Sequence, residues 1–422
     1  MTVRSRRIHP GWIAVAVTFA TLMATAGFRS APSVLIVPLE DAFGWSRSDI
    51  SLAVAINVLL FGLMSPFAAA LMEKFGIRRV VMSALTTISI GAFLTIFIQA
   101  PWQLIATWGV IVGVGTGSMA LVFAATVANR WFVAKRGLVT GVLTAASATG
   151  QLIFLPGLSH LANTYGWKSV SITVSSFAIL VVPFVFLFLR ENPSEVGLLP
   201  YGAAPDWQPP AKSELGAGAL AIDTLKQSAK KKDFWFLYGS FFVCGLSTSG
   251  LIGTHFIPAA HDHGMPTTLA ASLLALVGIF DVIGTIFSGW LTDRYDPRKL
   301  LFFYFGTRGL SLFLLPSILF SEIHASTLVF VIFYGLDWVA TVPPTIMLCR
   351  AILGPERASI VYGWVFTGHQ IGGAIAAFGA AILRVKLGDY AVAFYISGAM
   401  CIITAYFVLQ IAKGVDDKVL RT

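Results

Sequence analysis

Five ionisable side chains lie deep inside long apolar stretches of the sequence: Arg29, Asp281, Arg308, Asp337 and His369. A charged group at membrane depth costs roughly 2.5–3.5 kcal/mol on insertion scales, so it normally pairs with another charge, faces a cavity or carries protons. Two bases, two acids and one imidazole can neutralise one another, because a buried charge without a partner is strongly destabilising. The set therefore indicates either internal ion pairs or a site for protons and small charged molecules.

The two acids of this set are candidates for proton binding. Asp281 lies at the middle of an apolar stretch long enough to span a bilayer, which takes about 20 residues in a helix. Asp337 is followed by Pro343 and Pro344, which lack the N–H donor of a regular helix and should weaken it locally. A softened helix beside a buried acid suits a moving gate, whereas a pair with Arg308 would be purely structural. We therefore expect Asp281 and Asp337 to take part in proton coupling, with internal ion pairs as the alternative.

The basic and aromatic members are candidates for binding an anion. The planar guanidinium of Arg29 or Arg308 can hold both oxygens of a carboxylate, and the imidazole of His369 can hydrogen-bond an anion or share a proton. Tyr334, three residues before Asp337, is a further candidate for lining the site. Each charged residue has a structural alternative: Arg29 can extend to the membrane surface, Arg308 can neutralise an acid, and His369 can be a satisfied core residue.

The composition indicates a membrane protein that crosses the bilayer several times. Of its 422 residues, 56% are hydrophobic and only 12% are charged, whereas soluble domains carry about 25% charged residues. The net charge of +9 does not indicate nucleic-acid binding, because the basic residues lie in short loops between apolar runs, as topology signals do. No basic patch is interleaved with aromatic residues in the pattern that binds single strands. We therefore expect a lipid bilayer, and no nucleic acid, among its partners.

Twelve apolar segments predict an all-α membrane protein with twelve transmembrane helices in two six-helix bundles. The expected spans are residues 11–38, 46–72, 77–99, 102–129, 136–162, 167–189, 233–260, 266–292, 299–320, 326–349, 358–383 and 389–412. The long polar stretch after the sixth span has a Pro-rich part and a basic end, with a short amphipathic helix expected at residues 220–231. It divides the chain into a first bundle (1–190), a linker (191–232) and a second bundle (233–422).

Lysine and arginine are distributed unevenly between the loops. If the N-terminus is inside, the outer loops hold only Arg47, Lys168, Arg384 and Lys386. This bias predicts that both termini are cytoplasmic, in what we expect to be a bacterial inner membrane. The basic N-terminus leads into an apolar run that is too long for the core of a signal peptide, so we expect a retained first span.

Glycines recur at intervals of four residues in several expected spans. They are Gly109, Gly113 and Gly117; Gly137 and Gly141; and Gly368 and Gly372. Small residues at this spacing let membrane helices approach closely, so we expect these glycines to lie at contacts between helices.

Two charged loops occupy matching places in the two halves of the chain. One reads AALMEKFGIRR (69–79), and the other reads GWLTDRYDPRK (289–299). Glu73 and Asp293 lie 220 positions apart, as do Arg78 and Arg298. Parallel six-span halves are an architecture of transporters that bind their substrate near the membrane midplane, between the halves.

These loops resemble the signature G-x-x-x-D-[RK]-x-G-x-[RK]-[RK] of the major facilitator superfamily. The second copy has Asp296 at the glycine position, and the first departs at Ala69 and Glu73. The resemblance covers essentially the whole chain and implies an alternating-access carrier in which the two loops act as cytoplasmic gate latches. The residues that it implies for the gate are Glu73, Arg78, Asp293, Arg294 and Arg298.

Two further stretches resemble the monocarboxylate transporters and the related oxalate/formate antiporters: PLEDAFGWSRSDIS (38–51) and NRWFVAKRGLVTGVLTAASATGQLIFLP (129–156). This resemblance implies that Asp281 corresponds to the family's acid in the eighth span, which is linked to proton coupling. Many relatives place an arginine one turn later, where this chain has Thr285. It also implies functional basic residues in the first span, where Arg29 lies, and in the eleventh, where this chain has His369.

The sequence therefore predicts a secondary active transporter of small organic anions, specifically monocarboxylates, coupled to protons and working as a monomer. The missing arginine in the eighth span leaves an exporter of lipophilic or amphipathic compounds open, and an anion exchanger is a further alternative. A membrane enzyme or nutrient sensor is a third class, but no nucleophile–base pair stands out. No ATP-binding G-x-x-x-x-G-K-[ST] loop occurs. We expect no cofactor and no metal. His261 and His263 flank Asp262, but they lie in an expected outer loop, where a solvated turn is the better interpretation.

Overall fold

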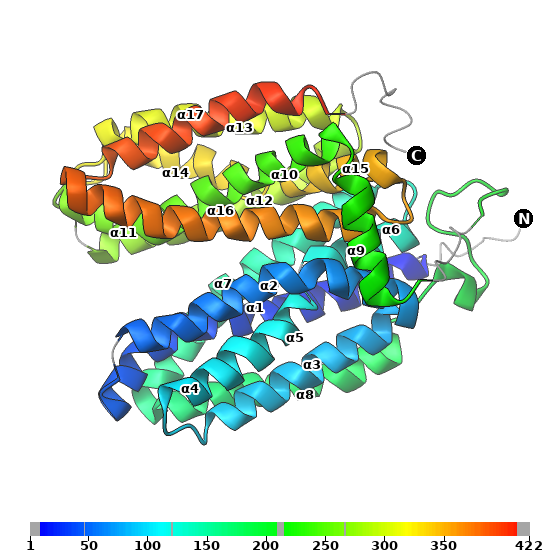
Figure 1. Cartoon of the computed structure of the whole chain (residues 1–422), viewed down its shortest axis with the longest axis horizontal. Helices are drawn as coiled ribbons and strands as arrows, with labels where there is room; N and C mark the ends of the chain where they lie inside the picture. Colours follow the sequence, from blue (N-terminus) through cyan, green and yellow to red (C-terminus); the bar gives the residue numbers. More distant parts are fainter. Residues whose placement is uncertain (1–8, 46, 120, 209–214, 266, 412–422) are drawn as a thin grey trace, which may run out of the picture.

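Long helices in two bundles form the protein. The computed structural model describes residues 9–45, 47–119, 121–208, 215–265 and 267–411. In Figure 1 the first bundle, coloured blue to green, and the second bundle, coloured green to red, lie side by side. The predicted all-α architecture with two six-helix bundles is confirmed.

Six spans make up the first bundle, and the fourth of them is irregular. Its elements are α1 (Pro10–Phe43), α2 (Arg47–Phe75), α3 (Ile77–Thr95), α4 (Pro101–Leu104), η1 (Ile105–Val112), α5 (Gly113–Gly117), α6 (Leu121–Trp131), α7 (Arg136–Tyr165) and α8 (Trp167–Phe188). The segment η1 is a π-helix within the fourth span, and π-helical turns occur frequently at functional sites.

The second bundle repeats the arrangement, with irregular seventh and tenth spans. Its elements are α10 (Lys232–Gly245), the π-helix η3 (Leu246–Ile252), α11 (Gly253–Asp262), α12 (Thr267–Thr292), α13 (Pro297–Ile318), α14 (Ala325–Asp337), α15 (Val342–Leu353), α16 (Ala358–Leu387) and α17 (Ala391–Val408). Between the bundles lie a short 3-10 helix, η2 (Pro193–Val196), and α9 (Ala217–Ser228). The amphipathic helix predicted in the linker is therefore present, three residues earlier than expected.

The observed helices match the expected spans closely. Among the described residues, ten helical stretches are long and apolar enough to cross a membrane. The long helices α1 and α7, which pack against each other in the first bundle, complete the set of twelve spans. The chain is thus a multi-pass integral membrane protein.

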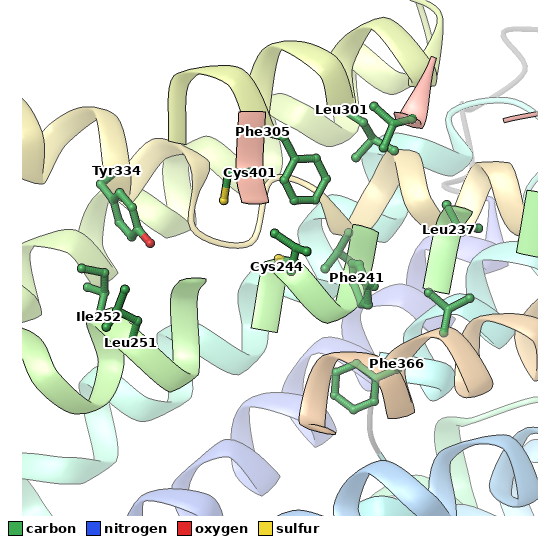
Figure 2. Packing of buried hydrophobic residues seen from close by; sticks show 14 of the residues in the cluster. Leu237, Phe241, Cys244, Leu251, Ile252, Leu301, Phe305, Tyr334, Phe366 and Cys401 are labelled. Atoms are coloured by element: carbon green, nitrogen blue, oxygen red, sulfur yellow. The ribbon is translucent and has the colours of Figure 1, made fainter. Parts of the chain in front are cut away.

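Each bundle has a large apolar core, and the core of the second bundle extends to Phe61 of α2. Glycines bring the helices close together. The core of the second bundle contains Phe241, Phe305 and Tyr334 (Figure 2). In the first bundle, a Cβ atom at Gly113 would lie 3.1 Å from Cα of Asn57 on α2, and one at Gly117 would lie 2.8 Å from the Leu60 carbonyl oxygen. The glycines spaced by four residues therefore lie where α2 meets the fourth span, as predicted.

The described contacts between the bundles cluster at one end of the molecule. We call this the charged end, defined by the two charged loops, residues 69–79 and 289–299. Near it α7 packs against α12, and α2 packs against α16. Helix α9 runs across this end and contacts α2, α15 and α16 (Figure 1). The molecule is therefore closed at its charged end.

Candidate functional site

The tenth span is broken at residues 338–341, and side chains from neighbouring helices bind the backbone groups of the break. The carbonyl oxygens of Asp337 and Trp338 accept hydrogen bonds from Arg308 of α13, at 2.6 and 3.3 Å. The Val339 N–H donates to Asp281 of α12 at 3.0 Å. Broken helices at membrane depth occur where the freed backbone groups find partners, and in transporters they commonly line the binding site. Two of the expected site residues, Asp281 and Arg308, therefore meet at this break.

Arg308 forms a buried ion pair with Asp337. Its Nε donates to Asp337 Oδ2 at 2.7 Å, and the two side chains are 0% and 7% exposed. A third donor, Nη1, points at the Cys244 sulfur 3.1 Å away, in the core cluster drawn in Figure 2. Within the described residues, Asp337 Oδ1 has no hydrogen-bond partner. Arg308 thus neutralises Asp337, which is one of the two roles expected for it, and Asp337 keeps one oxygen available.

Asp281 lies beside this ion pair and accepts hydrogen bonds instead of pairing directly with a base. Its Oδ1 accepts from Thr285 Oγ1 at 2.8 Å, in addition to Val339 N. The residue is 3% exposed. Thr285 therefore serves this chain as a hydroxyl donor to the acid. Burial disfavours the charged form of a carboxylate, whereas hydrogen-bond donors such as these favour it.

His369 and Tyr334 both lie near this polar cluster, His369 beside Cys244 and Tyr334 beside Ser247. The His369 ring stacks on Phe366, with centroids 5.7 Å apart, and lies 5.3 Å from Phe241. Its Nδ1 is buried and has no hydrogen-bond partner among the described residues. The Tyr334 hydroxyl donates to the Ser247 carbonyl of η3 at 2.9 Å, so its proton is already engaged. The fifth candidate, Arg29, belongs to α1, but its side chain lies outside the described part of the chain.

One expected gate residue, Asp293, connects the two bundles. Its Oδ1 and Oδ2 accept from the Gly137 and Leu138 N–H groups, at 2.7 and 2.9 Å. These N–H groups begin α7, where a helix has free donors and a positive dipole end. Burial raises the pKa of Asp293, while the two N–H donors oppose that rise. Asp293 of the second bundle therefore caps a helix of the first.

The contact is possible because glycines line both sides of it. A Cβ atom at Gly137 would lie 2.6 Å from the Gly289 carbonyl oxygen, and one at Gly141 would lie 2.7 Å from the Thr285 carbonyl oxygen. Both distances are far shorter than a carbon atom allows. The spacing of Gly137 and Gly141 thus permits α7 to pack directly on the backbone of α12, as predicted.

The described contacts of the other expected gate residues lie within their own bundles or, for Arg78, reach the start of the linker. Glu73 pairs with Arg130 at 3.4 Å. The Arg78 N–H donates to Glu191 at 2.9 Å, and its guanidinium lies over Phe186. Arg294 lies over the Trp290 ring at 3.9 Å, and Arg298 pairs with Asp296 at 2.9 Å.

Sequence reasoning overlooked several residues that these contacts involve. Arg130 and Glu191 form one charge cluster with Glu73, since Arg130 Nη1 lies 3.7 Å from Glu191. Arg130 and Glu191 both lie next to the ends of expected spans, where charged side chains often hold loops in place. This position could have indicated that they pair. Ser288 and Cys244 carried no such signal, since a small residue in an apolar run normally packs in the core.

Helix α9 adds a further connection at the charged end. Asp223 accepts from Arg357 at 2.6 Å, and this bond, together with one from Gln227, lowers the pKa of Asp223. The Trp364 indole N–H donates to the Ala221 carbonyl oxygen at 3.0 Å. The linker helix is therefore attached to the second bundle by defined bonds while it also packs against α2 of the first.

No cluster of three or more His, Cys, Asp or Glu side chains suited to a metal occurs within the described residues. His263 Nδ1 lies 2.8 Å from the Ala259 carbonyl oxygen, and Asp262 pairs with Arg384 at 3.1 Å. The side chain of His261 lies outside the description.

Replacing Asp293 by alanine should loosen the charged end. Loss of a helix-capping side chain typically costs about 0.5–2 kcal/mol, roughly a two- to thirtyfold change in an equilibrium. Here the change should favour separation of the bundles, because the cap and the helix belong to different bundles. A cysteine at Ser359, which is buried beside Asn129 at the interface, should react faster with a maleimide. Because burial raises the pKa of Asp293, lowering the pH should favour the same separation in the Ser359→Cys protein, seen as faster labelling relative to an exposed thiol at the same pH.

The matched control is Asp296→Ala. Asp296 lies in the same loop and also caps a helix, but it accepts from the Arg298 N–H of its own bundle at 2.9 Å. This variant should leave the labelling rate at residue 359 unchanged. Equal acceleration by both variants would contradict the special role of the Asp293 contact.

Three comparisons relate this chain to known proteins. The model of the Major Facilitator Superfamily matches residues 17–377. The chain is 24% identical over 421 residues to Monocarboxylate transporter 11 of Mus musculus, covering 96% of this chain and 88% of the relative. It is 25% identical over 385 residues to the uncharacterized MFS-type transporter YcxA of Bacillus subtilis (strain 168), covering 87% and 86%. The crystal structure of the human organic anion transporter MFSD10 (TETRAN) is similar in fold, with a TM-score of 0.72 at 16% identity over 94% of this chain and 99% of that one.

Proposed function

Since this chain belongs to the Major Facilitator Superfamily, we propose that it is a proton-coupled carrier of small organic anions, and of monocarboxylates in particular. That it is a transporter of this superfamily follows from the family match; the substrate class and the coupling are our proposal. The relatives named monocarboxylate transporters support the substrate class. The observation that carries the proposal is the cluster of Asp281, Arg308 and Asp337 at the break of the tenth span.

Proton coupling solves an electrostatic problem for such a carrier. An anion that enters a negative interior opposes about 2.3 kcal/mol per 100 mV. One proton carried with each monovalent anion cancels that cost. Asp281, held by a hydroxyl and a backbone N–H, is the group that we assign to the proton, with Asp337 as the second acid.

The Arg308–Asp337 pair offers a way to couple the anion to the proton. Arg308 already holds the carboxylate of Asp337, so a substrate carboxylate can take its place only if the one proton of the cycle passes from Asp281 to Asp337. A protonated Asp337 can release Arg308 without leaving a buried charge unpaired. Arg29, His369 and Tyr334 are the further residues that we assign to substrate binding.

The proposed cycle alternates between two arrangements of the bundles. The arrangement described above is closed at the charged end, which we assign to the cytoplasmic side of a bacterial inner membrane. Asp293 is the gate residue that holds the bundles together there, and Glu73, Arg78, Arg294 and Arg298 support the gate from within each bundle. The carrier works as a monomer, in two units with the boundaries predicted from the sequence. Opening requires that the loaded and empty forms favour different arrangements.

Uptake of labelled lactate or pyruvate into proteoliposomes, under an imposed pH gradient, tests the proposal. We expect accumulation that depends on the gradient and that unlabelled monocarboxylates inhibit. Exchange of internal for external carboxylate without any response to the gradient would indicate an anion exchanger. Thermal stabilisation by hydrophobic cations and by no carboxylate would favour an exporter of lipophilic compounds, a function that Thr285 in place of arginine also allows.

A further inference from the structure

We propose that the break between α14 and α15 is a hinge of the transport cycle, and that Ser288 is the positioning residue that holds this hinge in the closed arrangement together with Asp281. The inference rests on the proposed function, which makes Asp281 the proton-binding group. It adds a physical connection between the protonation of Asp281 and the contacts between the bundles at the charged end.

Two bonds fasten the break to α12. Asp281 Oδ1 accepts from the Val339 N–H at 3.0 Å, and Ser288 Oγ donates to the Ala340 carbonyl oxygen at 2.5 Å. Backbone groups freed at membrane depth need such partners, because each one without a partner costs several kcal/mol. Asp281 and Ser288 are seven residues apart, which places them two turns apart on the same face of α12. Two side chains of α12 therefore hold two adjacent residues within the break.

The position of α15 follows from these bonds. Helix α15 begins at Val342, directly after the break, and runs to the charged end. There Arg350 Nη1 donates to Asn129 Oδ1 of the first bundle at 3.3 Å. A hinge at residues 338–341 can swing this end of α15 while α14 stays in place. The bonds at the break thus fix a helix that contacts the opposite bundle.

Given the groups that surround Asp281, its protonation can control the position of this hinge. The charged or titratable groups around Asp281 and Ser288 are Arg308 and Tyr304 of α13, Asp337 and Tyr334 of α14, and Cys244 of α10. The sequence of α7 has no ionisable residue between Arg136 and His160, His255 of α11 is bound to the Ala377 carbonyl oxygen, and the one charge of α15 is Arg350. An ionised carboxylate accepts a hydrogen bond about twice as strongly as a neutral acid. Protonation therefore weakens the bond to Val339, and Ser288 becomes the main anchor of the break.

Distances within the second bundle test the hinge. Spin labels at Tyr295 and Glu356, which are exposed and flank α12 and α15, report whether α15 moves relative to α12. In the full chain in lipid nanodiscs, we expect a second distance to become populated as the pH falls. Asp281→Asn should show that second distance at every pH. Ser288→Ala should raise its share at neutral pH by roughly fivefold, the effect of one lost hydrogen bond, and should keep the response to pH.

Two control variants make the result specific. Ser288→Thr keeps the hydroxyl and should restore the distances of the parent protein. Ser240→Ala removes an equally buried hydroxyl that donates to its own helix, at the Leu237 carbonyl oxygen, and should change nothing. A distance that neither pH nor Ser288→Ala alters, or a pH response that survives in Asp281→Asn, would overturn the hinge. If Ser288→Ala does not fold, the Asp281→Asn comparison alone decides.

The measurement needs no substrate, so it separates the hinge from the proposed function. Absence of carboxylate uptake with an intact pH-dependent distance would refute the substrate class and leave the hinge standing. Carboxylate uptake with a fixed distance would show that the second bundle moves as a rigid body.

Discussion

Replacing Arg308 by methionine should lower the free energy of unfolding by about 3–5 kcal/mol, the usual result of removing one partner of a buried ion pair. The loss has two parts in this structure. The carboxyl group of Asp337 loses its partner at 2.7 Å and stays buried. The carbonyl oxygens of Asp337 and Trp338 also lose their donors at the break. Chemical denaturation of the purified protein in detergent measures the change.

A second substitution shows whether the ion pair is the cause. Arg308→Met combined with Asp337→Leu removes both charges, and we expect it to recover much of the stability, because no charge is then buried alone. Arg384→Met is the matched control, since Arg384 pairs with Asp262 at the surface, with side chains 42% and 27% exposed. That change should cost at most about 1 kcal/mol. A double variant no more stable than Arg308→Met would show that the backbone bonds of Arg308, rather than its pairing, dominate.

The spans could be predicted from the sequence because each one is a separate physical signal. A run of about 20 apolar residues between charged loops has few alternatives to a membrane helix. Glycines at intervals of four, such as Gly113 and Gly117, likewise indicated close helix contacts, which the structure shows against α2. These features depend on local sequence alone, so no knowledge of the tertiary fold was needed.

The partners within the site could not be predicted in the same way. Arg308 is separated by similar lengths of chain from Asp281 and from Asp337, so spacing could not decide between them. The structure pairs it with Asp337 because α13 lies against the start of the break. Pro343 and Pro344 pointed to a weak helix, yet the break precedes them, at residues 338–341. Its capture by Ser288 is a tertiary contact that leaves no pattern in the sequence.

The two charged loops occupy matching positions in the sequence but make different contacts. Their matching positions predicted matching roles, but in the described contacts Asp293 reaches the opposite bundle and Glu73 pairs with Arg130 in its own. The difference has a local cause. Gly289 lets α7 approach the backbone of α12, whereas the first copy has Ala69 at the corresponding position. One methyl group is enough to exclude the same close approach.

Asp281→Asn should abolish accumulation driven by a pH gradient while leaving exchange of carboxylates across the membrane. With one proton per anion, a gradient of one pH unit supplies about 1.4 kcal/mol, which is about tenfold in the accumulation ratio. Asparagine keeps an oxygen that can accept from Thr285 and Val339, but it does not bind a proton in this range. Labelled lactate in proteoliposomes should therefore reach about tenfold accumulation with the parent protein and none with the variant.

Two further measurements distinguish a coupling defect from simple loss of activity. Exchange of internal unlabelled for external labelled lactate at equal pH needs no net proton movement, so Asp281→Asn should retain it if the substrate site is intact. Glu322→Gln, which neutralises an exposed acid, should accumulate lactate as the parent protein does. Full accumulation by Asp281→Asn would show that the transported proton binds at Asp337 or His369 instead. Loss of exchange as well as accumulation would instead make Asp281 a part of the substrate site, because a group that only carries protons is not required when none move.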